Sequence, residues 1–302
     1  MDQETGRPTV GFVGLGVMGR GMAANVRKHG YPLTVFDVDR GALRQMEVTG
    51  ARVAASLPDL ARASTWIILC LPDTEAVERV LFGEDGLLPG LAPGQVIIDC
   101  GTTHPFATTA FENRLRAAGV CFLDGPVSGM ETRAREGSLT MMVGGEEAVF
   151  GQVEGLLRAM ASTVLRMGGP GTGQLAKMMN NVLFNISAAA IAEILPLAAR
   201  MDVDVGRMIE VVSTGTGMSF ALTFFGPLIL NRDFGPGYPL GKAFKDMEAI
   251  QEVARSCKAP VPATMGALET YRAALAEGYG KENKGAMVKV CEKALGVTVR
   301  SG

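Results

Sequence analysis

The sequence predicts an α/β unit followed by an all-α unit, with a long helix joining the two. From Pro8 to about Gly168, short β-branched or apolar runs alternate with longer runs at helical spacing, which is typical of a parallel sheet covered by helices. After the cluster Gly168-Gly169-Pro170-Gly171, only helical spacing remains. We therefore expect one domain at residues 1–169 and a second at 170–302, and 302 residues suit two domains of about 150 residues each.

Seven strands and three clear helices are predicted in the first domain from these periodicities. The helices end near glycines, with Gly30 and Gly119 as the clearest stops. The predicted strands are Thr9–Val13, Leu33–Phe36, Trp66–Leu71, Val96–Asp99, Cys121–Leu123, Leu139–Val143 and Val164–Arg166, and the predicted helices are Met18–Lys28, Thr74–Leu81 and Phe106–Ala118.

The second domain begins with a predicted helix from Gln174 to Met201, roughly 40 Å long at about 1.5 Å per residue. We expect Pro196 to kink it near its end. Its most apolar part, Val182 to Ala199, contains Asn185, Ser187, Glu193 and Pro196, which argues against a bilayer span. A helix this apolar needs burial on most faces, so we expect it to pack in the protein and to form part of a subunit interface in a homodimer or homotetramer.

The composition is that of an ordinary globular protein, with 47% hydrophobic residues, 20% charged residues and a net charge of -2. The chain has no excess of basic residues, so its composition does not favour nucleic acid or an anionic membrane as a partner. The five cysteines lack paired spacing, and the first eight residues lack the pattern of an export signal, so a reducing, cytoplasmic setting is expected. The chain has two histidines, too few to favour histidine catalysis or a common zinc site, and we expect no metal site.

A phosphate-binding loop is predicted at Gly14-Leu15-Gly16-Val17-Met18-Gly19, which fits G-x-G-x-x-G after a strand and before a helix. The first glycine permits a tight turn, the second lets the backbone approach a pyrophosphate, and the third lets the helix pack closely on the strand. The N–H groups at the helix start would then bind phosphate oxygens. A dinucleotide cofactor follows from this arrangement.

Asp37 ends the second predicted strand about twenty residues beyond the loop. A carboxylate at this place accepts hydrogen bonds from the ribose hydroxyls and repels a 2′-phosphate. The sequence therefore favours NAD, and Arg40 nearby leaves NADP open.

Four further motifs follow in order: Gly125-Pro126-Val127-Ser128-Gly129, Gly137 to Gly145, Gly171 to Asn181 with Lys177 inside it, and Lys245-Asp246-Met247. With these motifs the sequence resembles the β-hydroxyacid dehydrogenase family, over Val10 to about Ala294. The resemblance implies a Rossmann domain joined by a long helix to an all-helical domain, with the active site in the cleft between them.

The resemblance also implies roles for single residues. Lys177 matches the catalytic lysine and Asn181 the asparagine that helps to hold substrate. Residues matched to the substrate-carboxylate loop are Ser128 and Gly129, followed by Met130, and those matched to the cofactor are Leu71 with Pro72, Thr102 and Lys245.

The spacing of the residues supports these roles independently. Lys177 lies three and four residues before Asn180 and Asn181, so it shares a helical face with each amide. An ammonium supplies the proton that a carbonyl needs on becoming an alcohol, and the neutral amine accepts the proton in the reverse direction. The backbone and hydroxyl of Ser128 and Gly129 suit a carboxylate ligand.

The chain departs from the family pattern at several positions. Met130 and Arg133 stand where glycines are common, and Gly101-Thr102 replaces a Ser-Thr pair. These changes do not affect the predicted chemistry, but they leave the identity of the substrate undecided. The sequence therefore predicts an enzyme that moves hydride reversibly between NAD and a small carboxylate-bearing 3-hydroxy acid or its semialdehyde. An NADPH-dependent reductase of glyoxylate or succinic semialdehyde, and a catalytically silent nucleotide-binding module, are the alternatives.

Overall fold

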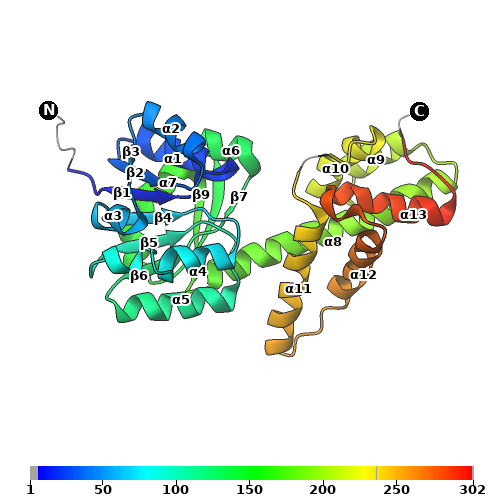
Figure 1. Cartoon of the computed structure of the whole chain (residues 1–302). Coiled ribbons are helices and arrows are strands. Elements are labelled where there is room, and N and C mark those ends of the chain that lie inside the picture. The colour runs from blue at the N-terminus through cyan, green and yellow to red at the C-terminus, as the bar shows by residue number, and fades with distance from the viewer. Residues whose placement is uncertain (1–5, 236, 301–302) are drawn as a thin grey trace. The chain divides into compact units, whose positions relative to one another are not determined.

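The computed structural model describes residues 6–235 and 237–300. The chain forms two compact units, Met1–Lys177 (unit 1) and Met178–Gly302 (unit 2), and the division falls within one long helix, α8 (Thr172–Arg200). Unit 1 contains a mainly parallel sheet with helices, and unit 2 is helical, so the predicted fold class is confirmed (Figure 1). The predicted domain boundary after residue 169 stays a prediction, because α8 belongs to both units and no single residue separates them.

The strands that the structure describes form one sheet with the order β3-β2-β1-β4-β5-β6-β8-β7, and β9 pairs with β8. Neighbours from β3 to β6 are parallel. The strands are β1 (Val10–Val13), β2 (Leu33–Phe36), β3 (Arg52–Val53), β4 (Trp66–Leu69), β5 (Val96–Asp99), β6 (Cys121–Asp124), β7 (Val127–Ser128), β8 (Leu139–Gly144) and β9 (Ala161–Gly168).

All seven predicted strands are present, with small shifts at their ends. Two strands were missed, β3 and β7, because two residues are too few to give an alternating pattern. The sheet is parallel from β3 to β6, as predicted, and at one edge β8 runs antiparallel to β6 and to β7. An apolar run carries no information about its direction, so only the tertiary pairing decides this.

Helices cover both faces of this sheet. Several begin with a side-chain cap: Asp39, Ser56 and Asp73 accept hydrogen bonds from the first turns of α2, α3 and α4. The helices of unit 1 before α8 are α1 (Val17–Lys28), α2 (Arg40–Val48), α3 (Leu57–Arg62), α4 (Thr74–Phe82), α5 (Pro105–Ala117), α6 (Met130–Glu136) and α7 (Glu147–Met160), with a short 3-10 helix at Leu88–Gly90.

Two hydrophobic cores lie on opposite faces of the sheet, because successive strand side chains point to opposite sides. Ile68 and Ile98 belong to the core that α1, α2 and α7 cover. Their neighbours Ile67 and Ile97 belong to the core that α3, α4 and α5 cover. Burial on both faces explains why the central strands read as continuous apolar runs.

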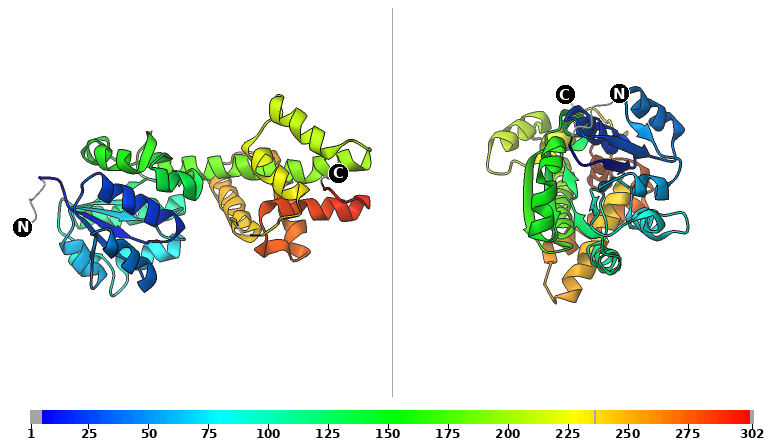
Figure 2. Two further views of the ribbon diagram at one scale, coloured as in Figure 1. Left: turned by 90° about the horizontal axis from the view of Figure 1, so that it is seen from above. Right: turned by 90° about the vertical axis from the view of Figure 1, so that its left-hand side faces the viewer.

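Unit 2 has its own core around the later part of α8. Helical structure in α8 continues through Pro196 to Arg200, and the predicted kink stays a prediction. Figure 2 shows α8 as one continuous green helix. The other helices are α9 (Val205–Thr214), α10 (Phe220–Leu230), α11 (Leu240–Ser256), α12 (Pro262–Ala276) and α13 (Val288–Leu295), with 3-10 helices η2 (Tyr279–Lys281) and η3 (Lys284–Met287).

Within the described residues, α8 is the helix whose length and apolar composition would also allow it to cross a membrane. Half of its most apolar 18-residue window is buried inside the protein, and a core helix of a soluble protein passes the same test. The exposed apolar residues on it include Leu183, Ile194 and Leu197. The helix therefore packs in unit 2 along part of its surface and leaves an apolar stripe open.

Candidate active site

The glycine loop after β1 has the geometry that a dinucleotide phosphate needs. Gly14 adopts φ +96°, and a Cβ placed on it would lie 2.3 Å from the carbonyl oxygen of Cys70. A Cβ on Gly19 would lie 1.9 Å from the carbonyl oxygen of Gly14. A Cβ on Gly16 would meet no protein atom within 4 Å. Gly14 and Gly19 thus serve the packing of the protein, whereas Gly16 leaves open space beside the start of α1.

The start of α1 is free to bind an anion. Gly16 occupies the N-cap position, and no side chain of the described residues caps this helix. The first turn of α1 therefore presents backbone N–H groups that intrahelical bonds do not use. Val17, the first residue of α1, is exposed. The loop fits the phosphates of a dinucleotide.

Asp37 lies directly after β2 and binds this loop. Its Oδ2 accepts a hydrogen bond of 2.5 Å from the Leu15 N–H, and its Oδ1 accepts one of 2.7 Å from the Asp39 N–H. The carboxylate therefore orients the glycine loop. Arg40 begins α2 and is exposed, so a guanidinium lies within three residues of Asp37.

The loops that follow β1, β4 and β5 lie against one another. A Cβ on Gly14 would lie 3.2 Å from Leu71, and one on Gly101 would lie 2.8 Å from the carbonyl oxygen of Leu71. Pro72 and Thr102 are exposed next to these contacts. The structure thus brings together Gly14, Leu71 and Thr102, as expected for a site at the carboxyl ends of parallel strands.

Two buried carboxylates that the sequence analysis missed organise this edge of the sheet. Asp99, at the end of β5, accepts a bond of 2.5 Å from the Thr103 hydroxyl and one of 2.9 Å from the Gly101 N–H. Asp124, at the end of β6, accepts bonds of 2.8 Å from the N–H groups of Gly171 and Gln174. Asp124 therefore caps α8, where the helix dipole favours a negative charge.

Burial dominates the ionisation of both carboxyl groups. It raises the pKa of Asp99 to about 6, with a smaller contribution from the charge of Asp124 and opposition from the hydrogen bonds of Thr103 and Gly101. Burial also raises the pKa of Asp124, against the backbone hydrogen bonds that stabilise its charge.

Gln174 completes the attachment of α8 to the sheet. Its side chain is 1% exposed, and its Oε1 accepts a bond of 3.1 Å from the Thr103 N–H while its Nε2 donates one of 3.0 Å to the Gly101 carbonyl. Lys177 follows three residues later, half-buried and on the same side of the helix. The first turn of α8 is therefore fixed to the loop that contains Thr102, and Lys177 extends from this fixed turn.

The predicted substrate loop is held by a different part of unit 1. Ser128 pairs with Thr140 across β7 and β8, and Gly129 adopts φ +142°. Met130 follows at φ +63° and is 51% exposed. Helix α6 then packs on α1, where the side-chain amide of Asn25 donates to the carbonyl oxygens of Ala134 and Arg135. A Cβ on Gly129 would lie 3.0 Å from the Arg133 side chain, so Arg133 occupies the space beside this loop.

The remaining predicted residues belong to unit 2. Asn181 is partly buried, and its Nδ2 donates a bond of 3.5 Å to Asp246. Asn180 and Lys245 are exposed. The hydroxyl of Tyr238 donates a bond of 3.2 Å to the same oxygen of Asp246. The sequence analysis passed over Asp246 and Tyr238 as partners of Asn181, because 57 or more residues separate them from it.

The two histidines differ in their surroundings. The Nδ1 of His29 lies 2.9 Å from the carbonyl oxygen of Asn25, so the ring contacts the C-terminal end of α1. His104 precedes α5, and its ring meets the ring of Phe106 edge-on at 5.4 Å. Across residues 6–235 and 237–300, no group of three or more His, Cys, Asp or Glu side chains could hold a metal ion.

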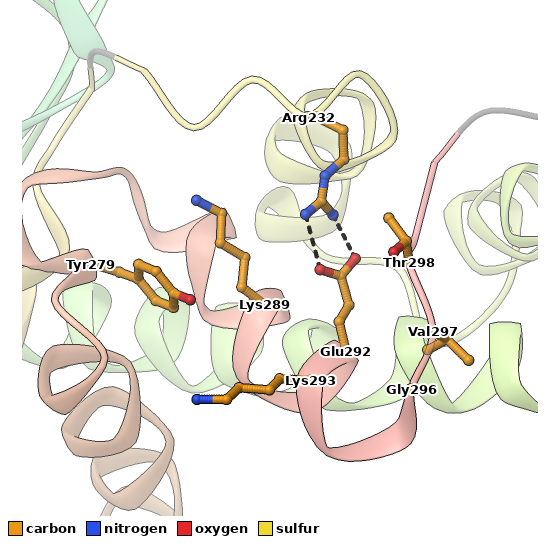
Figure 3. Close-up of a pocket in the computed structure, with 8 residues that line it drawn as sticks. All are labelled: Arg232, Tyr279, Lys289, Glu292, Lys293, Gly296, Val297 and Thr298. Atoms are coloured by element: carbon orange, nitrogen blue, oxygen red, sulfur yellow. Dashed lines mark hydrogen bonds and ion pairs between the residues drawn. The ribbon is translucent and has the colours of Figure 1, made fainter.

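A surface pocket of about 480 Å³ lies in unit 2, away from these motifs in the sequence. Figure 3 shows Glu292 reaching Arg232 through two bonds, with Lys289 and Lys293 beside them. Glu292 also accepts a bond from the Val299 N–H. Lys289 and Lys293 bind Glu282 and Glu277. The Val299 bond fastens the C-terminal segment to α13, and the ion pairs neutralise charges that line the pocket.

Comparisons with known proteins place these features in a family. Residues 9–169 match the NAD binding domain of 6-phosphogluconate dehydrogenase. Residues 171–291 match a domain described as NAD-binding of NADP-dependent 3-hydroxyisobutyrate dehydrogenase.

Similar curated proteins include 2-(hydroxymethyl)glutarate dehydrogenase of Eubacterium barkeri, 31% identical over 97% of this chain and 98% of the relative. Human mitochondrial 3-hydroxyisobutyrate dehydrogenase is 34% identical over 91% of this chain and 84% of the relative. Escherichia coli 2-hydroxy-3-oxopropionate reductase is 32% identical over 94% and 97% of the two chains.

Among solved structures, a 3-hydroxyisobutyrate dehydrogenase from Salmonella typhimurium superposes with a TM-score of 0.85 at 30% identity, covering 94% of this chain and all of that one. The two domain matches together span residues 9–291, nearly the whole chain. The chain belongs to the β-hydroxyacid dehydrogenase family.

Proposed function

We propose that this chain catalyses the reversible, NAD-dependent oxidation of a small 3-hydroxy acid to its semialdehyde, with Lys177 as the proton donor and acceptor. The observation that carries the proposal is the attachment of α8 to the sheet by Asp124 and Gln174. This attachment fixes the helix one turn before Lys177, beside the loop that contains Thr102. Family membership supports an oxidoreductase that acts on a CH–OH group with a nicotinamide cofactor.

The residues present fit a dinucleotide. Gly16 leaves space beside the uncapped start of α1, and Asp37 stands at the end of β2 with its carboxylate fixed by backbone N–H groups. When bound, NAD supplies the acceptor for the hydride that leaves the substrate. The negative charge of Asp37 disfavours a 2′-phosphate, whereas Arg40 would suit one. We propose NAD as the preferred cofactor, with Leu71, Pro72, Thr102 and Lys245 as further contacts.

Lys177 takes the hydroxyl proton during oxidation and returns it during reduction. Asn181 lies one turn further along α8 and, with Asn180, supplies amide groups for the substrate. Ser128, Gly129 and Met130 hold the substrate carboxylate through the hydroxyl and the backbone. In this assignment the carboxylate sets the orientation of the substrate and the lysine performs the proton transfer.

Initial rates with about twenty small hydroxy acids and semialdehydes, each with NAD and NADP, test the proposal. Lys177→Ala is expected to lower kcat by roughly 10² to 10⁴, as the loss of a general acid-base group does. Lys28→Ala, an exposed lysine at the end of α1, is the matched control and is expected to keep its activity. Near-normal turnover of Lys177→Ala would remove this residue from the mechanism.

The other results of this assay separate the alternative functions. A preference for NADPH, with reduction of glyoxylate or succinic semialdehyde, would favour the reductase and show that Asp37 does not set the cofactor. Quenching of cofactor fluorescence without turnover of any compound would favour a catalytically silent nucleotide-binding module.

We also propose that two or four copies associate through the apolar face of α8, α9 and α10. A groove of about 280 Å³ in unit 2 lies among Ile194, Met208, Val212 and Met218, and Leu197 and Val211 are exposed on the same helices. Light scattering on the purified protein should give a dimer or tetramer, and a concentration-independent monomer would refute the association.

The proposed compartment is the cytoplasm. All five cysteines are free thiols in the structure, which suits a reducing setting. Cell fractionation of the source organism would test this, and recovery with secreted or membrane material would overturn it.

A further inference from the structure

An arginine of unit 1 lies beside the predicted substrate loop and has no part in the proposed mechanism. Arg133 is the fourth residue of α6 and is half-buried. A Cβ placed on Gly129 would lie 3.0 Å from both the Cβ and the Cδ of Arg133, so the aliphatic part of this side chain runs along Gly129. Because Cδ is bonded directly to the guanidinium, the charged group of Arg133 begins next to this loop.

Hydrogen bonds on both sides of α6 hold the backbone of Arg133 in this place. Its carbonyl oxygen accepts bonds from the N–H groups of Gly137 and Ser138, the second at 2.9 Å, which tie the end of α6 to the residue before β8. On the side of α1, the buried amide of Asn25 donates to the next two carbonyl oxygens of α6. Unit 1 therefore fixes the position of Arg133 by itself, without a ligand.

The turn that leads into α6 is strained. Gly129 adopts φ +142°, and Met130 adopts φ +63°, a left-handed backbone conformation that methionine rarely takes. Residues other than glycine keep this conformation where the surrounding structure imposes it, and such positions cluster at active sites and ligand clamps. After this turn, Arg133 contacts Gly129 from four residues further along the chain. The strained turn thus brings a cation to the loop that follows β7.

The acidic residues nearest in the sequence do not neutralise this arginine. Glu136 lies one turn later, and its Oε2 accepts a bond of 3.2 Å from the Ser138 hydroxyl. Glu131 lies two residues before Arg133, which places it on the opposite side of the helix. Among residues 6–235 and 237–300, no carboxylate forms an ion pair with Arg133. The guanidinium is therefore available for an anion that these residues do not supply.

We infer that Arg133 binds the carboxylate of the substrate at the loop of Ser128 and Gly129, so that the enzyme selects hydroxy acids over uncharged compounds of the same shape. The inference rests on the proposed function, in which this loop receives that carboxylate. Ser128 and the backbone supply neutral donors. The guanidinium adds a positive charge and two parallel N–H groups, which match the two oxygens of a carboxylate. Arg133 is then a specificity-determining residue.

Pairs of substrates that differ in one charge test this role. Each hydroxy acid that the wild type turns over is compared with its primary amide, which has nearly the same shape and no charge. The wild type is expected to have a lower KM for the acid. Arg133→Met removes the guanidinium and keeps an unbranched side chain against Gly129. It is expected to raise the KM for the acid by about 10- to 100-fold, the effect of losing a hydrogen bond to a charged group. The KM for the amide should change less than about twofold.

Two further variants separate the charge of Arg133 from its packing. Arg133→Lys keeps a positive charge without the planar fork, so it should recover part of the affinity for the acid. Arg135→Met, at an exposed arginine of the same helix, is the matched control and should leave both members of each pair unchanged. The melting temperature without ligand should stay close to that of the wild type in all three variants. Equal losses for acid and amide in Arg133→Met, or no recovery in Arg133→Lys, would overturn the inference.

Binding without turnover distinguishes this inference from the proposed function. Butyrate and butyramide are titrated into the protein in the presence of NADH, and their dissociation constants are measured by calorimetry. The wild type is expected to bind butyrate more tightly than butyramide. Loss of that difference in Arg133→Met would support the role of Arg133 even if no hydroxy acid is turned over. Equal binding of the two compounds by the wild type, or binding of neither, would refute this role and leave the dehydrogenase assignment to the rate measurements.

Discussion

Replacing Gln174 by Leu removes the side-chain bonds that hold α8 to the sheet while nearly preserving volume. The substitution leaves the N–H of Thr103 and the carbonyl of Gly101 without their partner, and both residues are buried. A buried polar group without a partner costs about 1–3 kcal/mol, so the two together cost about 2–6 kcal/mol of unfolding free energy. Asp124 still caps the helix through the backbone of Gly171, so we expect the lower part of this range.

The effect on catalysis follows from the position of Lys177, one turn beyond Gln174. A displacement of about 1 Å at a catalytic group lowers turnover by about 10²-fold. We therefore expect kcat to fall by about 10- to 100-fold, with a smaller change in NAD affinity, because the glycine loop and Asp37 are bonded to each other independently of Gln174.

Two measurements check this prediction. Urea unfolding followed through the fluorescence of Trp66, the single tryptophan of the chain and part of β4, reports on unit 1. Steady-state rates give kcat and KM. Gln45→Leu is the matched control, because Gln45 is exposed and its side chain accepts a bond from Arg20 at the surface of unit 1. A Gln174→Leu variant with the stability and kcat of the wild type would refute the positioning role.

Two other predictions follow from the same unit. Gly16→Ala should keep the wild-type melting temperature and weaken NADH binding by at least about tenfold, since its Cβ meets open space where phosphate would lie. Gly19→Ala, in contrast, should destabilise the fold, because its Cβ would lie 1.9 Å from the Gly14 carbonyl oxygen. Tight NADH binding by Gly16→Ala would contradict the assignment of the loop. Burial raises the pKa of Asp99 from 3.8 to about 6, so between these pH values the folded state binds more protons than the unfolded state, and stability falls as pH rises. This shift of the Asp99 pKa changes the unfolding free energy by about 3 kcal/mol, at about 1.4 kcal/mol per pKa unit. Urea unfolding from pH 4 to 7 should show this loss of stability in the wild type relative to Asp99→Asn. Parallel stability curves for the two proteins would count against the prediction.

The sequence by itself determined the parts of this protein that depend on neighbouring residues. The change from alternating to helical spacing near Gly168 predicted the two kinds of structure. The glycine loop was predictable because each glycine answers a local steric requirement, and Asp37 because it follows the next strand at a fixed distance. The spacing of Lys177 and Asn181 placed them on one face of a helix, since helical geometry repeats every 3.6 residues.

Only the tertiary structure decided what those residues contact. Gln174 meets Gly101 and Thr103 from more than 70 residues away, and Lys284 meets Asn185 from 99 residues away. The reversed direction of β8 was also invisible in its apolar pattern. A buried carboxylate, amide or ammonium finds its partner through the folding of distant segments, and no periodicity along the chain records which segments meet. Local sequence therefore determines the glycine loop and the spacing of residues on α8. The long-range hydrogen bonds that fix these segments, and the burial of their charged groups, arise only from the fold.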